Sequence, residues 1–361
     1  MELQDFIDKN PNYIEIFREK RLHTRKYSKY GLLLVKTYYN NEYDYANHKW
    51  MRYCRGAIIN TETNRLVCIP PVKSDKLVNI DLDEYDDTYT YEPLIDGTMI
   101  NMFYHRNEWM ISTRSNIGAK NKWDGKVAFH KLFTSVNGDE WFNELNRSYS
   151  YSFTLQHKDN RIITPVYTNM IFINEVYDLR WGDINKVLRG DIPEIEGIYN
   201  IDRIHKEDLT LYLDRENEFS IKGFTIKKGC ERIKWINPNY EYVEGLRENY
   251  NNKLYNYLEL RKKWKLNEYL KYYPEERYIY DRYRDNYSIL KDNIYNSYVS
   301  MNIRKEIEIK DIRYELRPII KELHKNYQKN NEKVNMKCIT DYLQNMSSKR
   351  FIFIYNRMFS S

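Results

Sequence analysis

Several short segments between residues 54 and 238 carry side chains that can bind phosphate. Guanidinium and ammonium groups form charge-assisted hydrogen bonds with phosphate oxygens, and basic residues recur in these segments around one Asp-Gly pair. In order, the segments are CRG (54–56), IPPVKS (69–74), EPLIDGT (92–98), STR (112–114), SFTL (152–155), NRII (160–163), INEV (173–176), KGFTI (222–226) and RIKWINP (232–238). Each alone has an ordinary explanation: Asp96-Gly97 is a typical hairpin turn, and the basic residues are typical of strand surfaces paired with nearby acids. Their order along the chain is the informative feature.

The sequence lacks the patterns of several other kinds of site. It contains neither GxGxxG nor GxxxxGK[ST], and only 12 of its 361 residues are glycine, which disfavours a glycine-looped dinucleotide fold. The four cysteines show no CxxC pair, and the seven histidines show no HxxxH spacing. We therefore expect reduced thiols, without disulfides or a zinc site.

Hydropathy and the first residues bear on location. No apolar stretch approaches the roughly 18 residues of a membrane-spanning helix. The chain starts MELQD, which is acidic and polar and unlike a secretory signal. The high aromatic content, with 36 Tyr, 13 Phe and 7 Trp, argues against global disorder. We expect a folded intracellular protein, cytoplasmic and without a membrane partner.

Strand-like segments and turns dominate the chain up to Gly245. We expect strands near residues 31–39, 56–59, 66–69, 88–94, 99–104 and 108–113, and helices near 126–134 and 207–213. Residues 88–94 and 99–104 flank Asp96-Gly97 as the two strands of a hairpin would. This run of antiparallel strands predicts an α+β fold, with twisted sheets and helices packed on their outside.

The last third of the chain differs in composition and charge. Residues 246–361 contain no glycine and carry 24 Lys and Arg against 15 Asp and Glu, whereas the preceding residues are slightly acidic. Leu, Tyr, Ile and Lys recur there at helical spacing. We expect an α+β domain at 1–245 and a basic, Tyr-rich helical domain at 246–361. Its surface suits RNA phosphates or a partner protein; alternatively, its tyrosines are core residues of a solvated helical bundle.

The ordered segments resemble the motifs of the nucleotidyltransferase domain shared by RNA ligases, DNA ligases and mRNA capping enzymes. The likeness is greatest to phage-type RNA ligases that carry a helical C-terminal domain. It covers about residues 55–237, and the helical part matches by position only. The Asn-, Ile-, Lys- and Tyr-rich composition is similar to that of proteins from large DNA viruses. The resemblance implies a ligase-type fold, in which a motif lysine attacks the α-phosphate of ATP or GTP and a divalent metal assists.

The chain departs from the family pattern at three positions. The nucleophilic lysine is matched by Leu94, which has no lone pair with which to attack phosphorus. A glutamate that engages the ribose is matched by Thr154, and a glutamate that helps to place the metal is matched by Lys222. An ammonium group there should repel Mg²⁺ and can itself meet a phosphate. The other motif residues are kept, namely Arg55, Asp96, Gly97, Arg114, Arg232 and Lys234.

The resemblance and its departures predict a non-catalytic relative that binds RNA or a nucleotide, triphosphate or cap end. We expect no catalytic residue, metal ligand or cofactor. Binding is assigned to Arg55, Asp96, Gly97, Arg114, Lys222, Arg232 and Lys234, and RNA is the expected partner.

Two alternatives stay open. The first is an active RNA ligase or guanylyltransferase-like enzyme that uses Mg²⁺ and ATP or GTP. Its displaced nucleophile would be Lys73 or Lys76, with Glu92 or Glu175 as the replacement carboxylate. The second is a protein-interaction scaffold within a viral mRNA-processing or translation complex.

Overall fold

The structure, a computed structural model, describes most of the chain. It covers residues 2–38, 41–77, 80–86, 88–123, 127–180, 184–215, 218–229, 231–247, 250, 252–331 and 333–359. The chain divides into two compact units, Met1–Tyr242 and Val243–Ser361. The boundary expected after residue 245 falls inside helix α5 (Pro238–Arg247).

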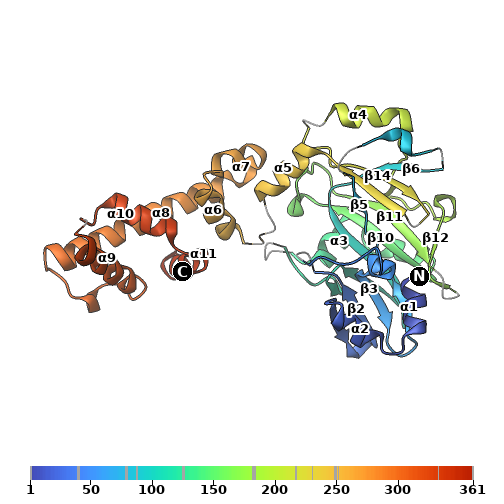
Figure 1. The fold of residues 1–361 in the computed structure, drawn as a ribbon, viewed down its shortest axis with the longest axis horizontal. Helices are drawn as coiled ribbons and strands as arrows, with labels where there is room; N and C mark the ends of the chain where they lie inside the picture. Colours follow the sequence, from blue (N-terminus) through green and yellow to red (C-terminus); the bar gives the residue numbers. More distant parts are fainter. Residues whose placement is uncertain are drawn as a thin grey trace. The chain divides into compact units, whose positions relative to one another are not determined.

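The first unit is an α+β fold of three sheets, most of whose strands are antiparallel (Figure 1). The first sheet has the order β1 (His23–Tyr27), β2 (Leu32–Lys36), β3 (Arg55–Asn60) and β4 (Arg65–Cys68). The second, central sheet has the order β12 (Asn185–Lys186), β11 (Met170–Asp178), β10 (Tyr149–Gln156), β7 (Thr98–His105), β8 (Glu108–Thr113) and β9 (Asn116–Ile117), and β13 (Ile198–Asn200) pairs with β11. The third has the order β5 (Asp75–Lys76), β15 (Glu231–Ile236), β14 (Gly223–Lys228) and β6 (Thr90–Pro93).

The hairpin predicted around Asp96-Gly97 is wrong. Strand β6 pairs with β14 in the third sheet, whereas β7 lies between β8 and β10 in the central sheet. Residues 94–97 therefore connect two sheets. The turn signal misled because local sequence does not show which distant strand each flank pairs with.

Other predicted elements are present with shifted ends. The antiparallel pair β3–β4 and the hairpin β7–β8 are confirmed. The two predicted helices are α3 (Phe129–Asn137), before which residues 124–126 lie outside the described part, and α4 (Leu209–Asp214). Cys54, Cys68 and Cys338 are free thiols, and Cys230 lies outside the described residues.

Hydrophobic contacts stack the first unit in layers. Helices α1 (Leu3–Lys9) and α2 (Tyr13–Glu19) cover the first sheet, where Phe6 stacks on Trp50 with ring centroids 3.9 Å apart. Leu34 and Phe103 join the first sheet to the central sheet. On the other face of the central sheet, Phe133 of α3 packs into a second core. The central sheet thus has one face under α3, and its opposite face packs in part on the first sheet.

The second unit is helical. Its helices are α6 (Lys253–Lys262), α7 (Leu266–Tyr272), α8 (Arg277–Tyr298), α9 (Arg317–Asn330), α10 (Met336–Asn345) and α11 (Ser348–Phe359). Tyr269 stacks on Tyr273 and on Tyr280, with ring centroids 4.5 and 5.6 Å apart, and all three are buried. These tyrosines are core residues, as the alternative explanation of the Tyr-rich segment predicted.

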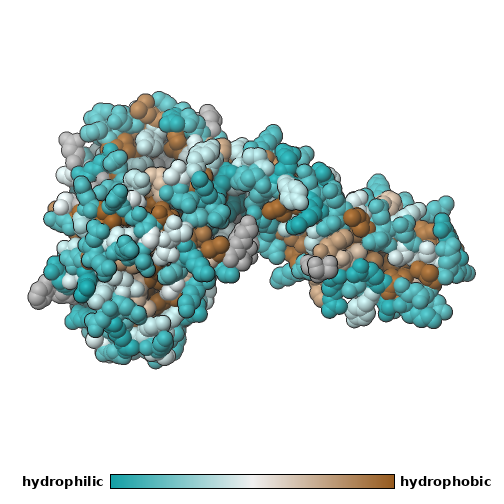
Figure 2. Space-filling view, turned by 180° about the vertical axis from the view of Figure 1, so that it is seen from behind, coloured by the Kyte–Doolittle hydropathy of each residue, from teal (hydrophilic) through white to brown (hydrophobic). Residues whose placement is uncertain are grey.

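Hydrophilic residues dominate the visible surface of both units, with hydrophobic residues in scattered groups (Figure 2). Scattered apolar residues are normal on folded proteins. Within the described residues, no helix is both long enough and apolar enough to cross a bilayer.

Candidate functional site

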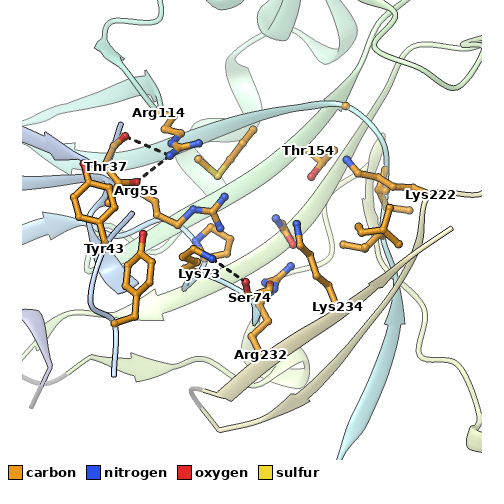
Figure 3. Close-up of a pocket in the computed structure, with 18 of the residues that line it drawn as sticks. Thr37, Tyr43, Arg55, Lys73, Ser74, Arg114, Thr154, Lys222, Arg232 and Lys234 are labelled. Atoms are coloured by element: carbon orange, nitrogen blue, oxygen red, sulfur yellow. Dashed lines mark hydrogen bonds between the residues drawn. The ribbon is translucent and has the colours of Figure 1, made fainter. Parts of the chain in front are cut away.

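One pocket in the first unit gathers most of the basic residues singled out from the sequence. Its volume is about 750 Å³, within the usual range for small-ligand sites. Six of its described lining residues are basic: Arg55, Lys73, Arg114, Lys222, Arg232 and Lys234 (Figure 3). Glu42 is the only carboxylate among the lining residues that the structure describes. The pocket is therefore strongly cationic.

Strands of the central sheet form one wall of the pocket. Met99 of β7, Thr154 of β10 and Asn174 of β11 line it, and Arg114 follows directly after β8. Because successive strand residues face opposite sides of a sheet, the neighbour Ile100 packs into the core under α3. The site thus lies on the face of the sheet away from α3.

A β-bulge in β11 re-aims side chains at this wall. The pairing of β10 with β11 shifts by one residue at Asn174, which is the extra residue. Ile173 and Val176 both pack into the core under α3, while Asn174 lines the pocket. Glu175 is buried and points to the third sheet, where it meets basic side chains. Bulges commonly turn a side chain in this way.

Four charged side chains form a buried network beside the pocket. Glu175 of β11 pairs with Arg232 of β15 and, at 3.1 Å, with Lys227 of β14. Lys227 also pairs with Glu92 of β6 at 2.5 Å. Burial alone would raise the pKa of Glu175, but Arg232 and Lys227 lower it well below its ordinary value. Both carboxylates weighed as replacements for a lost catalytic one are thus engaged by cations.

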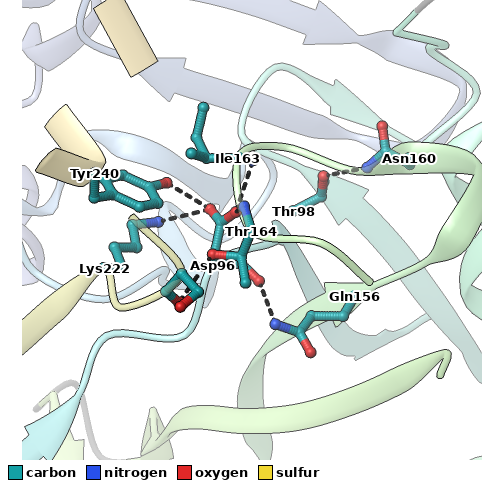
Figure 4. Close-up of polar contacts among 9 residues, drawn as sticks. Asp96, Thr98, Gln156, Asn160, Ile163, Thr164, Lys222 and Tyr240 are labelled. Atoms are coloured by element: carbon teal, nitrogen blue, oxygen red, sulfur yellow. Dashed lines mark hydrogen bonds and ion pairs between the residues drawn. The ribbon is translucent and has the colours of Figure 1, made fainter. Parts of the chain in front are cut away.

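Asp96 is the centre of a second buried network (Figure 4). Its carboxylate accepts hydrogen bonds from the Ile163 and Thr164 amides at 2.8 and 2.9 Å, and from the Tyr240 hydroxyl at 2.6 Å. Lys222 Nζ lies 3.4 Å from Asp96 Oδ1. Burial by itself raises the Asp96 pKa, but Lys222, Tyr240 and the two amides hold it below the ordinary value. Asp96 therefore holds Lys222 in place and is not itself among the lining residues.

Leu94 lies where the resemblance places the nucleophilic lysine, and it lines the pocket. Its amide donates a hydrogen bond to the Gly223 carbonyl at 2.8 Å, which fixes the end of β6 beside Lys222. Gly97, three residues on, is packed closely: a Cβ there would lie 2.5 Å from the Leu155 carbonyl oxygen and 2.8 Å from Thr154 Cγ2. The connection between the two sheets thus requires a glycine at this point.

Arg55 and Arg114 lie together at another part of the pocket (Figure 3). Gly56 has φ +109°, and a Cβ there would lie 2.8 Å from Arg114 Cα, so the backbones approach closely. Arg114 donates a hydrogen bond to Thr37 Oγ1 at 3.0 Å. Burial first, then the charges of Arg114 and Arg232, lower the pKa of Arg55 to about 10. Within the described residues, neither Arg55 nor Arg114 has a carboxylate partner at salt-bridge distance.

Lys73 also faces the pocket. Its ammonium lies 5.1 Å from the Tyr45 ring centroid and 3.4 Å from the Ser74 carbonyl oxygen. Burial, followed by the charge of Arg55, lowers the Lys73 pKa. Lys76, the other candidate for a displaced nucleophile, pairs with Glu241 and is not among the lining residues.

The donor set of the pocket does not fit the divalent metal that the resemblance implies. Mg²⁺ is bound in proteins through carboxylates, usually shared with substrate phosphates. Here the position assigned to metal support carries Lys222, and Glu92, Asp96 and Glu175 are held by cations or hydrogen-bond donors. No cluster of three His, Cys, Asp or Glu suited to a metal occurs among the described residues.

The structure places most of the predicted site residues together. Arg55, Leu94, Gly97, Arg114, Thr154, Lys222, Arg232 and Lys234 line the pocket, and Asp96 lies behind it. Thr37, Tyr43 and Tyr45 also line it and were not predicted. Among 36 tyrosines, no spacing or charge pattern distinguished these two. Their binding roles, like those of the predicted residues, stay predictions.

Solved structures similar to this chain are ATP-dependent DNA and RNA ligases. A putative ATP-dependent DNA ligase from Aquifex aeolicus is 13% identical, with a TM-score of 0.45, over 89% of this chain and 80% of the ligase. An archaeal ATP-dependent RNA ligase is 11% identical, with a TM-score of 0.46, over 78% of this chain and 73% of the ligase. A Naegleria gruberi RNA ligase with PPi is 11% identical, with a TM-score of 0.34, over 49% of this chain and 58% of the ligase.

No protein-family model and no curated protein matches the sequence. At such identities and TM-scores, the likeness to ligase structures assigns no activity, substrate or partner to this chain.

Proposed function

We propose that this protein binds the phosphate end of an RNA, or a nucleotide, without forming a covalent bond to it. The observation that carries the proposal is the pocket itself: its described lining includes six basic side chains, together with Leu94 at the place of the expected nucleophile. Leucine cannot attack phosphorus, whereas the cationic lining can still neutralise a chain of phosphates. The protein would be a non-catalytic relative of the ligases and capping enzymes that its motifs resemble.

Uncompensated charge supports this function. Lys222 and Arg232 have acidic partners in the fold, whereas Arg55, Lys73 and Arg114 have no salt-bridge partner among the described residues. Three such cations around one cavity repel each other, because burial weakens the screening of their charges. An anionic ligand would remove this repulsion. The pocket is therefore better suited to a bound anion than to a purely structural role.

A second candidate function is catalysis by Lys73. Its amine lies in the pocket with a lowered pKa, and a nucleophilic lysine must lose its proton to react. Against it, in-line attack tolerates little displacement, since a misplacement of about 1 Å can cost roughly 10²-fold in rate. We therefore rank covalent chemistry below binding. The viral origin, the RNA partner and a protein partner for the helical unit also stay proposals.

An adduct assay separates the two functions. The protein is incubated with α-³²P-labelled ATP or GTP and Mg²⁺, and acid-labile label on the chain is measured for the wild type and for Lys73→Ala. We expect no label on either protein. A labelled wild type that loses its label in Lys73→Ala would establish catalysis and contradict the non-catalytic proposal.

A binding assay tests the positive part of the proposal. Fluorescent RNA with a 5′-triphosphate end is compared with the same RNA bearing a 5′-hydroxyl, together with ATP as a competitor. We expect the triphosphate end to bind more tightly and the affinity to fall with added salt. Equal affinity for both RNAs, with no competition by ATP, would leave the pocket without a phosphate ligand and would sink the proposal.

A further inference from the structure

We propose that the pocket binds a triphosphate chain without a divalent metal, and that the Lys222 ammonium takes the metal's place. This inference rests on the proposed function and names its ligand chemistry: a metal-free triphosphate, whether on a nucleotide or on an RNA end. Its starting point is the disagreement between the pocket's donor set and the Mg²⁺ that the motif resemblance implies.

The position of Lys222 is fixed by the fold. Its ammonium lies 3.4 Å from Asp96 Oδ1 and 5.5 Å from the centroid of the Tyr240 ring, while its side chain lines the pocket. Asp96 itself is held by two backbone amides and the Tyr240 hydroxyl (Figure 4). An ammonium has three donor hydrogens, so one can serve Asp96 while the others face a ligand. Lys222 thus places a positive charge at a fixed position in the pocket.

The remaining charges favour the same ligand. Lys222 and Lys234 line the pocket on one side, and Arg55 and Arg114 line another part, with Lys73 and Arg232 between them (Figure 3). Metal coordination cancels part of the negative charge of a triphosphate, whereas the bare chain presents all of it. Among the described lining residues there are six cations and one carboxylate. Although Lys222 and Arg232 also have acidic partners behind the pocket, this lining attracts the bare chain more strongly. Added Mg²⁺ should therefore compete with the protein for the triphosphate.

Calorimetric titrations test this inference directly. ATP and a 5′-triphosphorylated RNA are titrated into the full-length protein in EDTA and in saturating Mg²⁺. We expect binding in EDTA and a weaker apparent affinity in Mg²⁺; comparing the two ligands shows whether the triphosphate of a free nucleotide or of an RNA end is preferred. Tighter binding in Mg²⁺ would overturn the inference but leave the proposed function standing. No binding of either ligand in either buffer would overturn both.

Two substitutions at Lys222 sharpen the test. Lys222→Gln keeps a donor for Asp96 but removes the charge, and we expect affinity in EDTA to fall by about tenfold or more, as for a lost charge-assisted hydrogen bond. Lys222→Glu puts a carboxylate in the pocket at the position assigned to metal support, where a divalent cation can bind it together with the ligand's phosphates, so binding should become Mg²⁺-dependent. Lys228→Glu, at an exposed position of the same sheet outside the pocket, is the charge-matched control and should behave as the wild type.

Each variant result bears on the role of Lys222. Circular dichroism first establishes which variants are folded. Unchanged affinity of a folded Lys222→Gln protein in EDTA would remove Lys222 from the site. A folded Lys222→Glu protein that gains no dependence on Mg²⁺ would show that the ammonium does not occupy a metal position. If Lys222→Glu does not fold because two carboxylates meet, the Lys222→Gln result decides alone.

Discussion

At the scale of single residues, Arg55 shows how the site departs from the rest of the fold. Burial of its guanidinium, and then the charges of Arg114 and Arg232, lower the pKa of Arg55 to about 10. A group that is repelled by its neighbours weakens the folded state. The cost to stability is explained if the Arg55 charge binds an anionic ligand, because binding sites often have lower stability than the rest of a protein in exchange for function.

Substitution of Arg55 should therefore separate stability from binding. In Arg55→Gln, we expect an equal or higher free energy of unfolding, because repulsion with Arg114 and Arg232 is removed. Affinity for 5′-triphosphorylated RNA should fall by about tenfold or more, since a charged hydrogen bond is lost. Urea denaturation and fluorescence anisotropy measure the two quantities.

Arg203→Gln, at an exposed position, is the matched control and should change neither quantity. A large loss of stability in Arg55→Gln with unchanged affinity would mean that Arg55 supports the fold and not the ligand.

At the scale of elements, the connection from β6 to β7 determines the geometry of the site. It carries Leu94 into the pocket and Asp96 into the network behind it. It crosses from one sheet to another, and it passes so close to β10 that no side chain fits at Gly97. The glycine is thus required by the neighbouring strand and not by a hairpin turn.

Gly97→Ala should destabilise the first unit. The added Cβ meets the Leu155 carbonyl and Thr154 Cγ2, and insertions of this kind into packed regions cost about 1–3 kcal/mol. Thermal unfolding, followed by circular dichroism, measures the change. Gly190→Ala is the control, because a Cβ at Gly190 meets nothing within 4 Å. Equal melting temperatures for the two variants would show that β10 can shift to accommodate the added Cβ without loss of stability.

Local sequence predicted part of this architecture. The β3–β4 pair, the β7–β8 hairpin and helices α3 and α4 carry clear local patterns, and the motif order gathered the residues that now line one pocket. The sheet that each strand joins could not be predicted, because pairing partners lie far apart in sequence: β6 pairs with β14. The bulge at Asn174 and the partners of Glu92, Glu175 and Asp96 depend on that pairing. Sequence therefore identified the basic residues but not which of them the fold neutralises.

At the scale of the whole molecule, the two units differ in charge. The helical unit is basic, and its buried tyrosines, such as Tyr269 and Tyr280, are used for packing. If this unit also binds RNA, its lysines would supply the contacts. Lys321, Lys325 and Lys329 of α9 are exposed and spaced four residues apart, which places them along one face of the helix.

Replacing these three lysines with alanine should weaken RNA binding and its salt dependence. For single-stranded RNA, each lost phosphate contact lowers the slope of log affinity against log salt by about 0.7, so three contacts account for a change of about 2. Anisotropy titrations from about 50 to 200 mM salt measure this slope. The matched control replaces Lys9, Lys131 and Lys158, three exposed lysines of the first unit. A slope that changes as much in the control would assign the effect to net charge alone.

Arg232 couples the pocket to the contact between two sheets. Its guanidinium lines the pocket and is also bound to Glu175, so it joins the third sheet to the central one. A phosphate that binds Arg232 must compete with Glu175 for its guanidinium. Glu175 would then depend on its ion pair with Lys227, which is also paired with Glu92. Ligand binding would therefore weaken the ion pairing between the third and central sheets. Amide hydrogen exchange along β15 should then become faster when the pocket is occupied.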